Sequence, residues 1–118
     1  MKTRTRLLAA VLALVPLTAL AHGIAVWAEV KDGKIHVEAH YSDGKPVANG
    51  KVTVSAGGKT VLTGKTGDKG DFDFAPPVRK ALAVKVVAGG HHGATATVKE
   101  EDLKDVPLAA PAPDGARR

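Results

Sequence analysis

The sequence predicts an all-β protein, a seven-stranded antiparallel β-sandwich, and three observations support this. Several short segments alternate strictly between apolar and polar residues, which is typical of half-buried strands. Glycine, proline, asparagine and aspartate recur between these segments, about every eight to twelve residues. After the N-terminal apolar run, no segment has the period of an amphipathic helix.

The N-terminal segment 1–21 is predicted to be a signal peptide that is cleaved after Ala21. Basic residues precede an apolar run at 7–14, and small residues precede the cleavage point, as signal peptidase requires. The apolar run is too short, and too soon followed by Pro16, for a membrane-spanning helix to be the first choice, although a retained anchor is the alternative. We therefore expect the protein in the periplasm.

The composition excludes several classes of protein. Of the 17 basic residues three lie in the predicted leader, so 14 remain against 12 acidic residues, a mature net charge of +2 rather than +5. The high isoelectric point therefore does not indicate nucleic-acid binding. Cysteine is absent, which excludes disulfides, thiol catalysis and zinc–thiolate sites, and the single methionine is the initiator. No catalytic triad, phosphate-binding loop or pair of carboxylates in a cleft is visible, so an enzyme is not expected.

The first two strands are predicted to form a hairpin with a fixed register. Residues 24–30 and 34–41 both alternate, and Asp32-Gly33 between them is typical of a two-residue turn. Pairing the two lysines that flank this turn sets Val30 opposite Ile35 and brings the apolar sides of both strands together, Tyr41 included. The outer face then carries Trp27, His36, Glu38 and His40.

Five further strands are expected after the turn-rich loop 42–50. They cover residues 51–55, 59–63, 71–74, 81–88 and 94–99. In the third of these, Phe72 and Phe74 are predicted to face inward and the two aspartates outward. The whole forms one domain over residues 22–100, followed by a disordered tail over 101–118 that is rich in proline, alanine and charge.

Three segments resemble the carboxypeptidase regulatory-like, transthyretin-like β-sandwich family. They are Asp43-Gly44-Lys45-Pro46-Val47, then Lys51-Val52-Thr53-Val54, then Thr66-Gly67-Asp68-Lys69-Gly70-Asp71-Phe72-Asp73-Phe74. In the last segment the chain departs from the family pattern, because Gly67 follows the threonine and the aspartate comes one place later. The resemblance covers about residues 40–90 and implies an Ig-like, transthyretin-like fold rather than a function.

A narrower resemblance covers nearly the whole mature chain. The cleavage site before His22-Gly23, the segment Val37 to Pro46 and the late Gly89-Gly90-His91-His92 are similar to small periplasmic proteins that accompany bacterial nickel and cobalt uptake systems. This resemblance implies a metal-handling accessory role beside a membrane metal-uptake complex.

Strand geometry predicts where metal ligands could gather. His36 and His40 lie about 13 Å apart along one strand, too far to share an ion, whereas Glu38 lies about 7 Å from each. Alternating strand directions bring the mature N-terminus, the end of the second strand and the loops 42–50 and 89–93 to one end of the domain. The candidate metal ligands are therefore His22, His40, His91, His92, Glu38 and Asp43.

His22 is a distinctive candidate because cleavage would make it the N-terminal residue. Its α-amine and ring nitrogen could chelate one ion, since the amine has a pKa of about 7.7–8.0 and deprotonates on binding. Such ligands suit nickel, cobalt, copper and zinc, and the resemblance favours nickel or cobalt.

Each candidate also has a plainer interpretation. His36 is expected on a solvated strand face, His91 and His92 in a polar loop, and Glu38 in a cross-strand contact beside Trp27. The alternative function is accordingly a non-metal β-sandwich interaction module of the cell envelope, which presents a strand edge or the Trp27 face to another protein.

Overall fold

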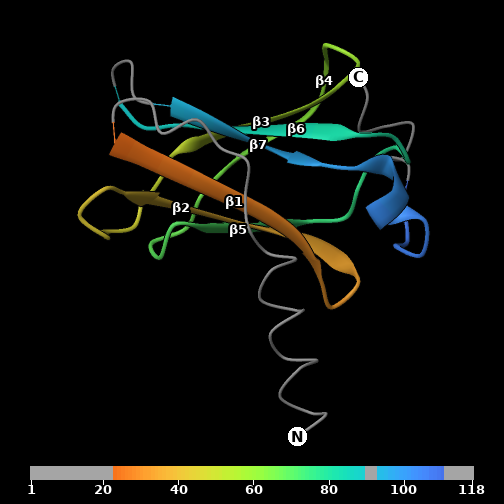
Figure 1. The fold of residues 1–118 in the computed structure, drawn as a ribbon, viewed down its shortest axis with the longest axis horizontal. Coiled ribbons are helices and arrows are strands. Elements are labelled where there is room, and N and C mark those ends of the chain that lie inside the picture. Colours follow the sequence, from red (N-terminus) through yellow and green to blue (C-terminus); the bar gives the residue numbers. More distant parts are fainter. Residues whose placement is uncertain (1–22, 90–92, 111–118) are drawn as a thin grey trace, which may run out of the picture.

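The computed structural model describes residues 23–89 and 93–110, which form an all-β protein of seven strands (Figure 1). One antiparallel sheet has three strands in the order β1-β2-β5, and the other has four in the order β4-β3-β6-β7. The two sheets lie in separate layers, in a sandwich-like arrangement (Figure 1). The strands are β1 (Ile24–Lys31), β2 (Lys34–Tyr41), β3 (Lys51–Ala56), β4 (Lys59–Lys65), β5 (Asp71–Phe74), β6 (Leu82–Val87) and β7 (Gly93–Val98).

The β1–β2 hairpin has the register that the sequence predicts. Val30 pairs with Ile35, and the pairing continues without a shift to Ile24 and Tyr41. Asp32 and Gly33 have φ angles of 53° and 77°, and positive φ at both central residues is the backbone that a two-residue hairpin turn requires. The turn and the alternation therefore agree on one register.

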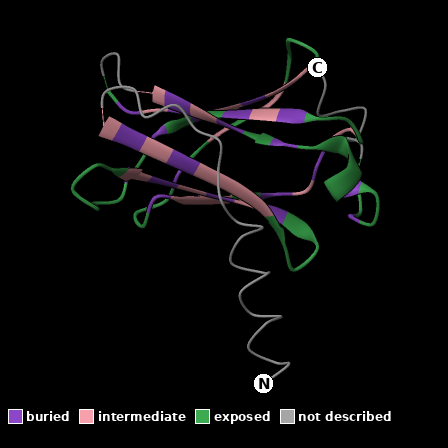
Figure 2. Ribbon diagram, viewed as in Figure 1, coloured by how far each residue is buried: buried purple, intermediate pink, exposed green. Residues whose placement is uncertain are grey.

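The inward faces of both sheets form one core of small apolar side chains. Ile35, Val37 and Ala39 of β2 are completely buried, and buried residues of β3, β6 and β7 meet them from the other sheet (Figure 2). Phe74 is buried and Phe72 half-buried against this core, as predicted. Tyr41 pairs with Ile24 as predicted, but the residue is 38% exposed, because it lies at the end of β2 and at the margin of the core.

The folded part of the chain continues past residue 100, so the prediction that a disordered tail begins at 101 is wrong for the residues that the structure describes there. A short 3-10 helix, Glu100–Leu103, follows β7, and Leu103 and Val106 are both buried in the core. The Arg79 guanidinium donates hydrogen bonds to the carbonyls of both residues. Two apolar residues and one arginine therefore dock a segment that is otherwise charged and proline-rich.

Three predicted features lie outside the described residues: the signal peptide, His22, and the loop histidines His91 and His92. Within the described ranges, no helix is long and apolar enough to cross a membrane.

Gly70 fastens the turn before β5 to the end of β2. Its carbonyl accepts the Ala39 backbone N–H at 2.8 Å, and its own φ is +78°. A Cβ at this position would lie 2.5 Å from the Ala39 carbonyl oxygen and 3.1 Å from the Val47 nitrogen. Both neighbours are backbone atoms, one in β2 and the other in the segment between β2 and β3, so they cannot move aside cheaply.

We expect Gly70→Ala to lower the free energy of unfolding by about 2–4 kcal/mol, since it combines a strained φ with overpacking. Gly44→Ala is the matched control: Gly44 also has a positive φ, +91°, but a Cβ there meets nothing within 4 Å. The control should cost only about 1–2 kcal/mol. Urea unfolding followed by circular dichroism measures both, and equal losses would contradict the close approach at Gly70.

The docking of the C-terminal segment gives a second prediction. Leu103→Ala should lower the free energy of unfolding by about 2–5 kcal/mol, because Leu103 is completely buried and its truncation leaves a cavity. Leu108→Ala should change it by less than about 0.5 kcal/mol, because that side chain is 42% exposed. Thermal or urea unfolding of both variants tests this, and a silent Leu103→Ala would mean that the segment is detached in solution.

Candidate functional site

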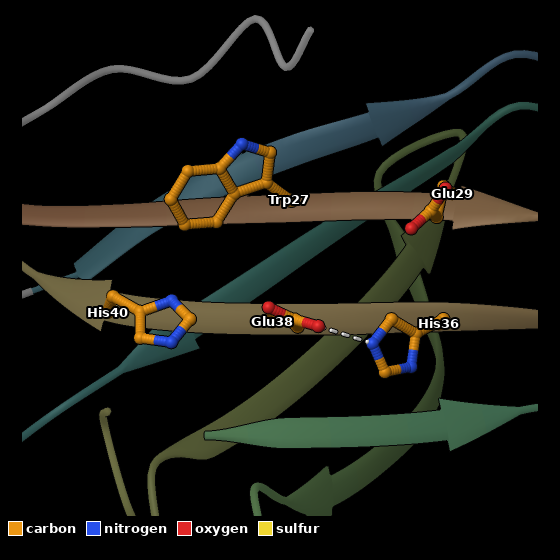
Figure 3. A pocket seen from close by; sticks show the side chains of 5 residues that line it. All are labelled: Trp27, Glu29, His36, Glu38 and His40. Carbon is orange, nitrogen blue, oxygen red and sulfur yellow. Dashed lines mark hydrogen bonds and ion pairs between the residues drawn. The ribbon is translucent and has the colours of Figure 1, made fainter. Parts of the chain in front are cut away.

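The outer face of the three-stranded sheet carries a pocket of about 230 Å³ that is open to solvent (Figure 3). Strand alternation places the lining side chains there, because each apolar residue that points into the core leaves its neighbour pointing outward. Since β1 and β2 are paired, the outward side chains of both strands stand next to one another. The pocket is lined by Trp27, Glu29, His36, Glu38 and His40.

His40 stands against the indole of Trp27. The two ring centroids are 5.6 Å apart and the ring planes meet at 70°, which is an edge-to-face contact. The residues are diagonal neighbours, since Trp27 pairs with Glu38 and His40 pairs with Ala25. His40 is therefore held in place on a rigid strand, next to the only tryptophan in the sequence.

His36 bridges two carboxylates instead of being solvated as the sequence analysis expected. Its Nδ1 lies 2.5 Å from Asp73 Oδ1, its Nε2 lies 2.8 Å from Glu38 Oε2, and its side chain is only 13% exposed. An ionised carboxylate can accept hydrogen bonds but cannot donate them. Both ring nitrogens must therefore carry a proton to satisfy both contacts. The geometry therefore selects the positively charged imidazolium.

The pKa of His36 reflects the same contacts. Burial of the ring disfavours its charge and lowers the pKa, but the hydrogen bonds that the ring donates to Glu38 and Asp73, together with their negative charges, outweigh burial. The net result is a pKa raised above the ordinary value of 6.5. Because Asp73 is on β5 and His36 on β2, the charged ring also ties the edge strand to the centre of its sheet.

The predicted metal ligands are only partly described. His40 and Glu38 share the outer face of β2, but Glu38 already accepts a hydrogen bond from His36. Asp43 is exposed in the following turn and accepts the Lys45 backbone N–H at 3.0 Å. Among residues 23–89 and 93–110, no three histidine, aspartate or glutamate side chains converge as a metal site would require. In the His36 cluster, the two ring nitrogens each face a different carboxylate.

The ends of three strands lie together, as chain direction predicts. Ile24 pairs with Tyr41, and β1 and β7 begin at the same end of the molecule (Figure 1). A Cβ at Gly23 would lie 3.1 Å from Ser42 Oγ, so the residue that follows His22 lies beside the residue that follows β2. This end of the fold is where the sequence analysis placed the metal ligands.

Comparison with known proteins gave no match to a protein-family model, to a curated protein or to a solved structure.

We expect the His36 bridge to make stability depend on pH. Since the pKa of His36 is raised in the folded state, its contribution is complete below about pH 6.5, the unfolded value, and is lost as pH rises through the folded pKa. The difference in melting temperature between the wild-type protein and His36→Gln, in metal-free buffer, should be larger at pH 5.5 than at pH 9. An identical difference at both pH values would show that His36 is not charged in the fold.

Proposed function

We propose that the mature protein binds a divalent transition metal in the periplasm, nickel or cobalt, and assists its uptake through a membrane complex. One observation carries the proposal: Gly23, the residue next to His22, lies beside Ser42, and Ser42 is two positions from His40 in the sequence. His40 points outward from the last part of β2, and Gly93, which follows His92, begins β7 at the same end (Figure 1). The described neighbours of His22 and His92, and His40 itself, thus lie at one end of the fold.

The proposal depends on cleavage after Ala21, since only then does His22 carry a free amine. An N-terminal histidine offers two nitrogen donors, and His40 offers a third from a strand that fixes its position. His91 or His92 would complete the set from the adjacent loop, with Asp43 or Glu38 as an oxygen ligand or as a hydrogen-bond partner that orients a ring. Copper and zinc suit the same nitrogen donors, so the preference for nickel or cobalt rests on the resemblance alone.

We also infer that the fold is an Ig-like, transthyretin-like β-sandwich of the carboxypeptidase regulatory-like kind. The support is the pair of antiparallel sheets with one shared core, and the agreement of β3 and β5 with the segments that carry the resemblance.

Calorimetry with nickel and cobalt tests the metal site on three proteins: the chain that starts at His22, the same chain with one alanine added before it, and His40→Ala. The added alanine removes the terminal chelate without removing any side chain, so it separates the amine from the ring. We expect each change to weaken binding by about tenfold or more, the loss expected for one good ligand. Affinity should also fall as pH drops through about 6.5, because protonated imidazole cannot bind a metal.

Equal affinity in all three proteins would remove the proposed site. Binding weaker than the micromolar range in every case would favour the alternative function, a non-metal interaction module of the cell envelope. The mass of the protein purified from the periplasm is the necessary control, because a first residue other than His22 removes the chelate from consideration.

A further inference from the structure

The outer face of the three-stranded sheet is acidic around its pocket. In the described part of this face, the cationic side chains of Lys31 and Lys34 lie at the hairpin end, away from His40. Nearer the middle, the imidazolium of His36 is the positive group, and it is held by two of the carboxylates. The carboxylates that point outward from three neighbouring strands are Glu29, Glu38, Asp71 and Asp73.

The shape of the pocket limits what could occupy it. Pockets that enclose a complete small ligand usually measure about 300–1,000 Å³ and bury most of its surface. This one measures about 230 Å³ and is open along the sheet. It therefore fits the end of one side chain, while the remainder of the occupant would lie on the surrounding strands.

The lining of the pocket favours a planar cation. Trp27 offers a half-buried aromatic ring, which attracts a cation over its face. Glu29 has no ion pair within the described residues, and Glu38 uses Oε2 for His36, which leaves its other oxygen toward His40 (Figure 3). A guanidinium group can stack on an indole and bond a carboxylate with two parallel N–H groups, whereas a lysine ammonium cannot do both.

We propose that this pocket receives an arginine side chain from a basic segment of a partner protein, which lies across β1 and β2. Charge complementarity selects the segment, because Glu29 and Glu38 line the pocket and the two aspartates of β5 lie on the neighbouring strand. Trp27 and the bound arginine form the buried centre of the contact, as tryptophan and arginine commonly do at interfaces. This site does not depend on metal binding, and it is tested with a chelator present.

The fluorescence of Trp27 reports binding directly, because the sequence contains no other tryptophan. The probes are a blocked pentapeptide with a central arginine between glycines and serines, its twin with neutral citrulline in that position, and arginine amide whose α-amine is acetylated, so that it carries the same single charge as the peptide. We expect saturable binding of the arginine peptide that weakens as salt rises. The citrulline twin should bind about tenfold more weakly, because it loses the charge. Arginine amide should also bind several-fold more weakly, because it contacts the pocket alone.

Glu29→Gln should weaken binding of the arginine peptide about fivefold or more while leaving the circular dichroism spectrum unchanged. The matched control is Glu101→Gln, which removes the same charge from an exposed position on the 3-10 helix and should leave binding unchanged. Equal affinity for the arginine and citrulline peptides, or an unaffected Glu29→Gln, would overturn the arginine site.

Two other outcomes would overturn the partner segment in particular. Equal affinity for the peptide and for arginine amide would assign the pocket to a small molecule. If the peptide binds only after residues 111–118 are removed, the pocket would be assigned to the two arginines of the chain's own C-terminal segment.

Discussion

The pairing of β1 with β2 fixes both the core of this protein and its candidate sites. One side of each strand packs into the core, and the other side carries the candidate site residues. With the observed register, Ile35, Val37 and Ala39 face the opposite sheet. A slip of one residue would turn them to solvent and would push His36 and Glu38 into the core. Buried charges without partners cost several kcal/mol, so the core and the polar face enforce the same register. The positive φ angles at Asp32 and Gly33 set that register at the turn.

β2 is also the central strand of its sheet, and both other strands pair with it. It lies between β1 and β5, and the short strand β5 is the edge of the sheet. Two contacts outside the regular ladder fasten this edge: the charged ring of His36 reaches Asp73, and the Gly70 carbonyl accepts the Ala39 N–H. The sequence contains no cysteine, so no disulfide can stabilise this edge strand, and these two contacts help to hold it in place.

The two proposed functions meet at His40. Its ring contacts Trp27 in the acidic pocket, and its strand position is close to the end where the N-terminus enters β1. A metal bound at that end and an arginine bound in the pocket would therefore be neighbours, with Glu38 and His40 close to both. The metal ion and the arginine are both positively charged, so binding of one should lower the affinity of the protein for the other.

The sequence by itself determined the seven strands, the hairpin register and the outward positions of Trp27, Glu38 and His40, because alternation and turn chemistry are local properties of the chain. It did not predict that His36 bridges Glu38 and Asp73, since that contact depends on how β5 aligns with β2, 37 residues away. It placed Leu103 in a tail, although Arg79 and the core hold it. Only the tertiary structure decides these contacts, because the energy that favours them comes from burial and charges between segments that no local pattern connects.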